Sequence, residues 1–206
     1  MLENDASADP QIVIGLTGLK AAGKDVFAHY LAAHHGFMVR SCGDEVRAAL
    51  HEEGVATPTI IQQVEMGNRR RQESNDIAYW PKRVYDACRA AGAQRIIVNG
   101  LRHPQEVLGL GEWAGDEIFT VVGVVAPIIV RAQRLLTRGR PGDPKTMEEF
   151  LQLDDTDRGI GQPPYGQQVD RTLALVPFDN LYDNRGTLAE YHAWIERFVR
   201  RHLLLV

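Results

Sequence analysis

The sequence predicts an α/β fold of three layers, in which helices flank both faces of a five-stranded parallel β-sheet. Short apolar runs rich in β-branched residues alternate with longer helical patterns along the chain. The run Ile118–Ala126 is apolar and rich in Val, as expected for a strand that is buried on both faces. Neither an internal repeat nor a Pro/Gly/Ser-rich linker divides the chain. Because strands that alternate with helices are typical of a parallel sheet, we expect a single domain over residues 1–206.

Each expected strand is a short apolar run that leads into a turn or a helical pattern. The first run ends at Thr17-Gly18 and the third at Asn99-Gly100. In chain order the expected strands are Ile12–Leu16, Phe37–Val39, Ile96–Val98, Ile118–Ala126 and a fifth somewhere within Leu173–Tyr182.

Helical patterns fill the intervals between these strands. Gly92 marks the end of one helix and Pro127 the start of another, because Gly favours the position after a helix and Pro its first turn. The expected helices are Lys24–His35, about Asp44–Glu53, Thr57–Arg71, Asn75–Ala91, Pro127 to about Thr137, a helical core near Thr146–Asp157, and Thr187–Arg200.

The composition is that of an ordinary soluble globular protein. The chain has 206 residues, of which 44% are hydrophobic and 24% charged, so it can bury a full core without disulfides or a structural metal. Its net charge of −4 argues against a protein whose main role is to coat nucleic acid, although a local basic cleft remains compatible with it. The seven histidines show no metal-ligand spacing.

Targeting and redox signals point to the cytoplasm. The two cysteines, Cys42 and Cys88, form no CxxC pair, which fits a reducing compartment. The first eleven residues are polar and acidic, unlike a signal peptide or an anchor. No apolar run approaches the roughly 18–20 residues that a membrane span needs. We therefore expect a cytoplasmic protein without a membrane partner.

The segment Gly18–Lys24 follows the first strand and opens the first helix. Its sequence, Gly-Leu-Lys-Ala-Ala-Gly-Lys, fits the phosphate-binding P-loop pattern G-x-x-x-x-G-K (Walker A). The glycines let successive N–H groups turn towards phosphate oxygens, and Lys24 can reach the β- and γ-phosphates of a nucleotide. The alternative is a glycine-rich turn without a ligand. The context of strand, loop and helix favours a loop that binds ATP or another nucleoside triphosphate.

Asp25 replaces the Ser or Thr that usually follows the P-loop lysine and ligates Mg²⁺. A carboxylate can also ligate Mg²⁺, directly or through water. The same Gly-Lys-Asp ending occurs in phage deoxynucleoside monophosphate kinases and in animal phosphomevalonate kinases. The resemblance favours small-molecule kinases over GTPases and motor ATPases.

Two further segments resemble the acceptor sites of nucleotide kinases. Ser41–Arg47 is similar to the Ser-x-Gly-Asp-x-x-Arg stretch of adenylate kinases, in which the arginine binds the acceptor phosphate. Asn99-Gly100-Leu101-Arg102 is similar to the Asp-Gly-x-x-Arg and Asp-Gly-Ile-Arg stretches of nucleotide kinases, which would make Arg102 a second phosphate ligand. Asn99 stands in place of the family's aspartate and can orient a metal-bound water. A solvated Arg47 behind a helix cap at Ser41 or Asp44 is the alternative for the first segment.

Arginines gather around a segment rich in Gly and Pro, Arg138–Gln168, which we expect to be a small lid insertion. The pattern Arg131-x-x-Arg134-x-x-x-Arg138-x-Arg140 resembles the arginine-bearing start of the lid in these kinases, and Arg158 is a further candidate. A lid that brings arginines to the transferring phosphoryl group stabilises its charge. Each arginine taken singly could instead be solvated.

The run Asn68–Arg71 carries three arginines in sequence. Such a run is usually a solvated helix end. The alternative is a basic rim for a large or polymeric acceptor such as DNA.

Together these stretches follow the order of the nucleoside monophosphate kinase superfamily over nearly the whole chain. Gly43–Arg47, Asn99–Val107 and Arg138–Arg140 with Glu148–Phe150 also resemble an archaeal and bacterial group described as dephospho-coenzyme-A-kinase-like. The resemblance implies a three-layer P-loop NTPase fold with a lid insertion at about 138–168. It also implies ATP and Mg²⁺ as cofactors, and a donor base packed near the loop Asp183–Gly186.

The resemblance implies a role for each matching residue. The catalytic residues would be Lys24, Asp44, Arg134 and Arg138, and the metal residues Asp25 and Asp44. Nucleotide binding would use Leu19, Ala21, Ala22, Gly23, Lys24, Asp25, Val26, Arg134 and Asn184, and acceptor binding would use Gly43, Asp44, Arg47 and Arg102.

The function expected from these residues is an ATP-dependent phosphotransferase for a small phosphate-bearing acceptor, with (deoxy)nucleoside monophosphates as the first choice. Dephospho-coenzyme A and modified bases within DNA are alternative acceptors. A nucleotide-binding regulator or slow ATPase without transfer activity is the alternative from a different class, and Asp25 and Asn99 would support it. The sequence leaves the acceptor, the choice between ATP and GTP, and the oligomeric state open.

Overall fold

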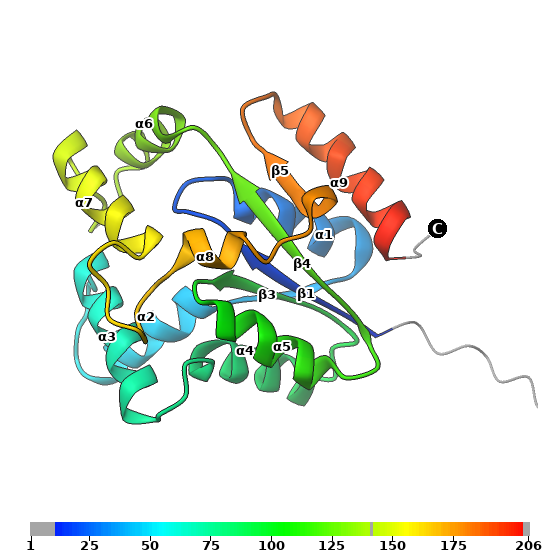
Figure 1. Cartoon of the computed structure of the whole chain (residues 1–206), viewed down its shortest axis with the longest axis horizontal. Coiled ribbons are helices and arrows are strands. Elements are labelled where there is room, and N and C mark those ends of the chain that lie inside the picture. Colours follow the sequence, from blue (N-terminus) through cyan, green and yellow to red (C-terminus); the bar gives the residue numbers. More distant parts are fainter. Residues whose placement is uncertain (1–10, 141, 204–206) are drawn as a thin grey trace, which may run out of the picture.

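The computed structural model describes residues 11–140 and 142–203, so the expectations for residues 1–10 and for Pro141 lie outside it. Its described strands form one parallel sheet (Figure 1). The strands are β1 (Ile12–Thr17), β2 (Met38–Ser41), β3 (Arg95–Leu101), β4 (Ile118–Val125) and β5 (Leu181–Asp183), in the spatial order β2-β3-β1-β4-β5. The predicted three-layer α/β fold with five parallel strands is confirmed.

The helices connect these strands and cover both faces of the sheet (Figure 1). They are α1 (Lys24–His35), α2 (Cys42–Glu52), α3 (Ile60–Glu73), α4 (Tyr79–Ala90), α5 (Pro104–Ala114), α6 (Ile128–Arg138), α7 (Met147–Arg158), α8 (Val169–Leu173) and α9 (Leu188–His202), with a 3₁₀ turn, η1 (Phe178–Asn180), before β5.

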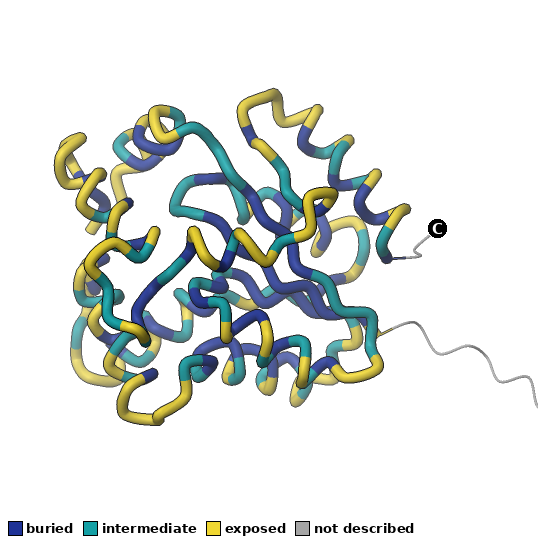
Figure 2. The backbone as a smooth tube through the Cα atoms, viewed as in Figure 1, coloured by how far each residue is buried: buried dark blue, intermediate teal, exposed yellow. Residues whose placement is uncertain are grey.

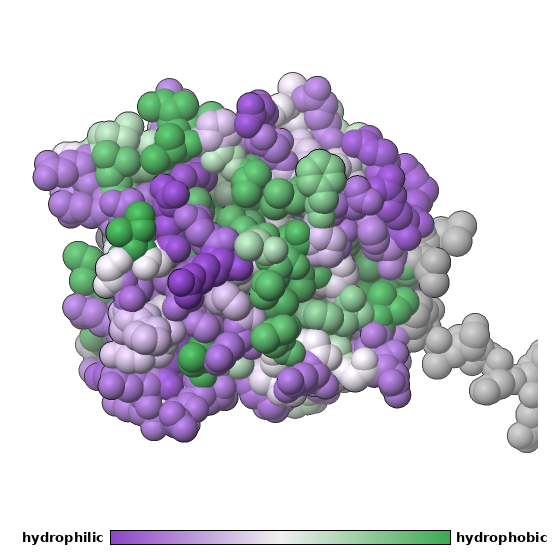
Figure 3. Space-filling model, in the orientation of Figure 1, coloured by the Kyte–Doolittle hydropathy of each residue, from purple (hydrophilic) through white to green (hydrophobic). Residues whose placement is uncertain are grey.

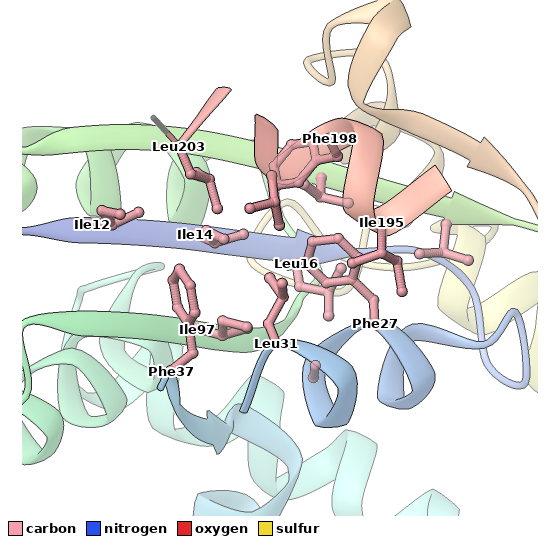
Figure 4. Packing of buried hydrophobic residues seen from close by; sticks show 14 of the residues in the cluster. Ile12, Ile14, Leu16, Phe27, Leu31, Phe37, Ile97, Ile195, Phe198 and Leu203 are labelled. Carbon is pink, nitrogen blue, oxygen red and sulfur yellow. The ribbon is translucent and has the colours of Figure 1, made fainter. Parts of the chain in front are cut away.

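The central strand β1 contributes side chains to two separate cores because successive residues of a strand point to opposite faces. Ile14 and Leu16 pack with Phe27 of α1 and Ile195 of α9, as Figure 4 shows. Val13 belongs to the opposite core, which α2, α4 and α5 cover. The central strands β1 and β3 are accordingly mostly buried, as their dark blue colour in Figure 2 shows. The parallel pairing of β1 with β3 places their carboxyl ends side by side.

Local signals set several helix boundaries. Thr59 and Thr187 each begin a helix with a capping box, in which the side chain accepts a backbone N–H and the residue three positions on binds back. The same arrangement, with His103 and Glu106, begins α5. The sequence analysis did not predict α5, although Pro104 at its first turn and Glu106 in its capping position were a readable signal.

The fifth strand lies at the end of the segment in which it was expected. Only Leu181 and Tyr182 of the window Leu173–Tyr182 are strand, and β5 extends to Asp183. Leu173 ends α8, and Pro177 precedes η1. A three-residue edge strand carries too little pattern to be located within ten residues.

Figure 3 shows the same face as Figure 1, with hydrophilic residues around its rim and hydrophobic residues gathered near its centre. The segment between α8 and β5 contributes Leu175 and Phe178, which are exposed. The described helices lack the length and apolar character that a bilayer span requires.

Candidate functional site

The loop between β1 and α1 has a backbone shape that depends on its glycines. Gly18 has a φ of 140° and Gly23 a φ of 111°, values that residues with a Cβ rarely adopt. A Cβ at Gly18 would lie 2.2 Å from the carbonyl oxygen of Val124, and one at Gly23 would lie 2.2 Å from Nδ2 of Asn184. The loop therefore packs closely on β4 and on the connection after β5, and it leads into the N-terminus of α1, whose free N–H groups favour an anion.

Two lysines of this loop lie in a partly buried, cationic environment. Lys24 Nζ donates to the carbonyl oxygens of Gly18 at 2.5 Å and Leu19 at 3.0 Å, so the side chain folds back over the loop. Burial, and then the nearby charge of Arg102, lowers the pKa of Lys24 to about 8. Burial also lowers the pKa of Lys20 to about 8, although Asp157 partly offsets this effect. These lowered pKa values indicate a buried site in which positive charges exceed negative charges. A bound phosphate would supply further negative charge.

Asp157 of α7 connects this loop to β3. Its carboxylate is fully buried and accepts the backbone N–H of Lys20 at 3.0 Å and Lys20 Nζ at 3.0 Å. Arg102, just after β3, donates to the same carboxylate and to Gln167 Oε1 at 3.1 Å. Burial alone would raise the pKa of Asp157, but Arg102, Lys20 and Lys24 outweigh burial and hold the pKa well below its usual range. The acceptor arginine predicted from sequence and the P-loop thus meet at one carboxylate.

The sequence analysis assigned no role to Asp157. A signal was present, because Asp154 and Asp157 lie three residues apart on a helix and share a face. Asp154 forms a buried ion pair with Arg131, and Asp157 binds Arg102. Two acidic residues on one face next to an arginine-rich segment indicate ion pairs, but the sequence does not tell which arginines they bind.

Asp25 lies beside Asn99, as a metal role for this pair requires. Asn99 Nδ2 donates to Asp25 Oδ1 at 3.0 Å, while Asn99 Oδ1 is buried and has no hydrogen-bond partner among the described residues. A carboxylate and an unpaired amide oxygen beside a phosphate-binding loop fit Mg²⁺, which prefers oxygen ligands and keeps several waters. Asp25 would hold the ion, and Asn99 would orient one of its waters.

No cluster of three or more His, Cys, Asp or Glu side chains suited to a metal ion occurs within residues 11–140 and 142–203. The second predicted metal residue, Asp44, is exposed on the first turn of α2, where its carboxylate forms an ion pair with Arg47. Its metal and catalytic roles stay predictions.

Arg134 and Asn184 lie against the P-loop, where the sequence analysis expected nucleotide-binding residues. Arg134 donates to the carbonyl oxygens of Ala21, Ala22 and Asn184, each at 3.3 Å. The buried Asn184 side chain donates to Ala22 O at 2.7 Å. Asn184 therefore stabilises the loop directly, and Arg134 joins the loop to the connection after β5. The remaining predicted nucleotide-binding residues, Leu19, Gly23 and Val26, belong to the same loop and the first turn of α1.

A cleft lies beside this charged centre, and two of the residues predicted for the acceptor, Gly43 and Arg102, line it. Lys20, Gly43 and Arg102 line it together with residues of α2, α3 and α4. Its apolar walls come from Val46, Ile60, Val64 and Trp80. Arg47 lies at its margin, because its Nη1 donates at 3.2 Å to Gln63, which lines the cleft. The structure thus brings Gly43, Arg47 and Arg102 around one hollow with an apolar wall and a cationic end.

The lid arginines take different positions. Arg138 is exposed and donates through Nε to Asp143 at 2.8 Å. Arg158 pairs with Asp170 at the surface. Arg131 is buried, and it pairs with Asp154 and lies over the ring of Phe150, so it is a structural residue of the lid.

The arginine run on α3 differs from the expected solvated helix end. Arg69 and Arg70 pair with Glu53 at the surface, which agrees with that expectation. The expectation was wrong for Arg71, which is 4% exposed and pairs with the fully buried Glu106. The reason is helical geometry: Arg71 lies on the face of α3 that packs inward, where Met66 and Gly67 are also buried.

Comparison with solved structures shows a shared fold. The chain superposes on an unliganded sugar kinase from Janibacter sp. HTCC2649 with a TM-score of 0.54 and 19% identity, covering 96% of both chains. It also resembles shikimate kinase from Aquifex aeolicus, with a TM-score of 0.50, 15% identity and coverage of 93% of this chain and 98% of that one. A third neighbour is TT1252 from Thermus thermophilus, with a TM-score of 0.53, 18% identity and coverage of 95% and 97%.

Comparison of sequences gives closer relatives. The chain is 30% identical over 185 residues to the UPF0200 protein of Thermoplasma acidophilum, covering 88% of this chain and 91% of the relative. It is 30% identical over 189 residues to the UPF0200 protein of Methanoculleus marisnigri, covering 92% and 96%. No family model matches the chain. The identity and the coverage nevertheless place this chain in the UPF0200 protein family, and its fold is that of the P-loop kinases.

Proposed function

We propose that this protein is an ATP-dependent phosphotransferase whose acceptor is a small phosphate-bearing molecule, most readily a (deoxy)nucleoside monophosphate. The observation that carries the proposal is the meeting of Lys20 and Arg102 at Asp157. One residue belongs to the donor loop and the other lines the acceptor cleft, so donor and acceptor phosphates would approach each other at this point. The kinase fold of the structural neighbours supports the reaction class.

The residues around this point would have three roles: binding of the donor phosphates, positioning of the loop, and binding of the metal. The N–H groups at the start of α1, together with Lys20 and Lys24, bind the phosphates of the donor and stabilise negative charge where it develops. Arg134 and Asn184 hold the loop in the shape that binding requires. Asp25 would hold the metal, and Asn99 would orient one of its waters. Bound ATP supplies the transferred phosphoryl group, and Mg²⁺ neutralises part of its charge.

On the acceptor side, Arg102 and Arg47 present planar guanidinium groups, which bind phosphate through two parallel hydrogen bonds. The apolar wall formed by Val46, Ile60 and Trp80 excludes water from the body of the acceptor. Residues 138–168, which include Arg138 and α7, form the lid and contact both the P-loop and Arg102 through Asp157. Together these features support transfer to a bound acceptor in preference to water.

The polymeric acceptor receives less support. Arg69 pairs with Glu53, Arg70 pairs with Glu53 and Glu73, and Arg71 is buried, so this run does not form a free basic rim for DNA. A regulator or ATPase without transfer activity remains the second candidate, since Asp25 and Asn99 depart from the residues usual at their positions.

Incubation of the purified protein with labelled ATP, Mg²⁺ and a panel of nucleoside monophosphates and dephospho-coenzyme A tests the proposal. We expect label to move to an acceptor, and Lys24→Met to lower the rate by about 10²-fold or more, because a main charge on the donor phosphates is lost. Lys82→Met is the matched control, since Lys82 is a surface lysine paired with Asp86. Release of phosphate at a rate that no acceptor changes would favour the ATPase.

A further inference from the structure

The buried ion pair between Arg71 and Glu106 lies in the wall of the acceptor cleft, and the phosphate-binding residues described above do not include it. Arg71 is 4% exposed and Glu106 is fully buried. Arg71 lines the cleft together with Trp80 and Val64. Burial of an arginine costs free energy unless its N–H groups find hydrogen-bond acceptors. Any N–H group of Arg71 that lacks a good acceptor in the protein therefore indicates which kind of ligand atom could bind there.

Glu106 binds residues from two sides of the cleft, Arg71 on α3 and the backbone after β3. Its Oε1 accepts Arg71 Nε at 3.1 Å and Nη2 at 2.6 Å. Its Oε2 accepts the backbone N–H of Arg102 at 2.6 Å and that of His103 at 3.2 Å. One carboxylate therefore fixes both the guanidinium of Arg71 and the backbone from which the Arg102 side chain extends to Asp157. The distance between these two ligand-binding groups is thereby set by the fold.

Arg71 has hydrogen-bonding capacity left over. Within the described chain, the acceptor near its Nη1 is Asn68 Oδ1 at 3.5 Å, which is the outer limit of a hydrogen bond. A guanidinium has five N–H donors and no acceptor, and Nε and Nη2 are engaged with one oxygen of Glu106. Nη1 of a residue that is almost fully buried is left to meet an acceptor atom of a ligand in the cleft.

The charges distinguish the two ends of the cleft. At one end three cations, Lys20, Lys24 and Arg102, act on the single carboxylate of Asp157, and this excess of positive charge suits a phosphate. At the other end Glu106 neutralises Arg71 one to one. That end offers donors without net charge, which suits a neutral carbonyl oxygen better than a second anion.

We propose that Arg71 is a specificity residue that binds an oxo group on the ring of the acceptor, so that the enzyme prefers nucleotides with an oxo-substituted base over those with an amino group at the same position. This inference rests on the proposed function. A donor-only side chain pairs with a carbonyl oxygen, but it meets an exocyclic amino group donor to donor. The apolar side chains that line the cleft, among them Val46, Ile60 and Val64, would contact the ring itself.

Two pairs of acceptors differ mainly in this group: UMP against CMP, and IMP against AMP. We expect kcat/KM to be at least about tenfold higher for the oxo member of the pair whose ring size the cleft accepts, since a well-placed pair of hydrogen bonds gives discrimination of this order. Equal values, or a preference for the amino member, overturn the inference while the proposed function stands.

The variant that tests the residue is Arg71→Gln combined with Glu106→Gln, because removal of Arg71 alone would leave a buried carboxylate without a partner. An amide can both donate and accept, so we expect the preference for the oxo member to fall to about twofold or less. The matched control is Arg69→Gln with Glu53→Gln, the same exchange of a surface pair involving the same helix, which should retain the preference. A double variant that folds and keeps the full preference overturns the assignment of Arg71.

Arg71→Lys gives a second route if the double variant does not fold. Lysine keeps a positive charge beside Glu106 but lacks the planar, forked guanidinium group. We therefore again expect the preference for the oxo member to fall. If the wild-type protein phosphorylates no nucleoside monophosphate and no dephospho-coenzyme A, the proposed function fails. The same pairs are then compared by calorimetric binding, where tighter binding of the oxo members supports the role of Arg71 and equal binding overturns it.

Discussion

Asp157 binds Lys20 through both oxygens of its carboxylate, one to the backbone N–H and one to Nζ, each at 3.0 Å, across 137 positions of sequence. This contact joins the lid helix α7 to the P-loop. Arg102 donates to the same carboxylate. The donor loop, the acceptor cleft and the lid are therefore connected through one buried carboxylate. The predictions below start from this connection.

Asp157→Asn should destabilise the free protein by about 3 kcal/mol, because Lys20 and Arg102 lose their counter-charge while they stay partly buried. An anion can replace the lost charge, so inorganic tripolyphosphate should raise the melting temperature of the variant more than that of the wild type. Thermal unfolding with and without tripolyphosphate measures both effects. Asp155→Asn, a change at an exposed position of the same helix, is the control. Equal stabilisation of wild type and Asp157→Asn would contradict the charge argument.

Nucleotide affinity should fall as the pH rises through about 8. In the free protein Lys20 and Lys24 lose their protons near that pH, well below the usual value for lysine. Bound phosphates favour the charged lysines, so binding above pH 8 must take up protons and is weakened by about tenfold per pH unit for each lysine concerned.

Calorimetric titration at pH 8.5 in buffers of different ionisation heat measures the proton uptake directly. Lys24→Met should reduce the uptake, since one of the two titrating groups is gone. An affinity that stays constant between pH 7 and 9.5 in the wild type would show that these lysines do not face the phosphates.

Asp25→Asn should raise the Mg²⁺ concentration needed for half-maximal activity by about tenfold or more, because a carboxylate ligand becomes a neutral amide. Binding of metal-free nucleotide should be unchanged or tighter, since a negative charge beside the phosphates is removed. Asp44→Asn is an informative comparison, because Asp44 was predicted as the second metal residue. If both variants shift the Mg²⁺ requirement equally, Asp44 also takes part in metal binding. If Asp25→Asn weakens the binding of metal-free nucleotide as much as it raises the Mg²⁺ requirement, Asp25 is not a metal residue.

The lid, residues 138–168, should open in the free protein and become protected when ATP and acceptor are both bound. Its buried apolar contact is small, Phe150 against Ala132 and Leu135 of α6. Its other contacts are mainly polar and include the ion pairs of Asp154 and Asp157 and the hydrogen bond from Arg102 to Gln167. A segment with few buried apolar contacts opens more readily than the sheet. Hydrogen exchange over this segment, with β1 and β3 as the stable reference, measures the change. Protection equal to that of the sheet without ligands would make the segment a fixed insertion, and Arg138, Arg140 and Arg158 would lose their claim to catalysis.

The strand–loop–helix unit at residues 12–35 could be predicted because its signals are local. The apolar run of β1, the two glycines of the loop and the start of α1 each depend on neighbours within a few residues. The same holds for the helix caps at Thr59 and Thr187. Arg102, the arginine predicted to bind the acceptor, could be singled out for the same reason, since it follows β3 directly in the chain.

The sequence by itself thus determined the layers of the fold and the position of the glycine-containing loop between β1 and α1. Only the tertiary structure decided which charges meet. Asp157 reaches Lys20 and Arg102 from another part of the chain, and Arg71 turns from an apparently solvated run to pair with Glu106. The physical reason is that periodicity and propensity act over a few residues, whereas a buried charge is satisfied by whatever partner the packed helices bring within about 3 Å.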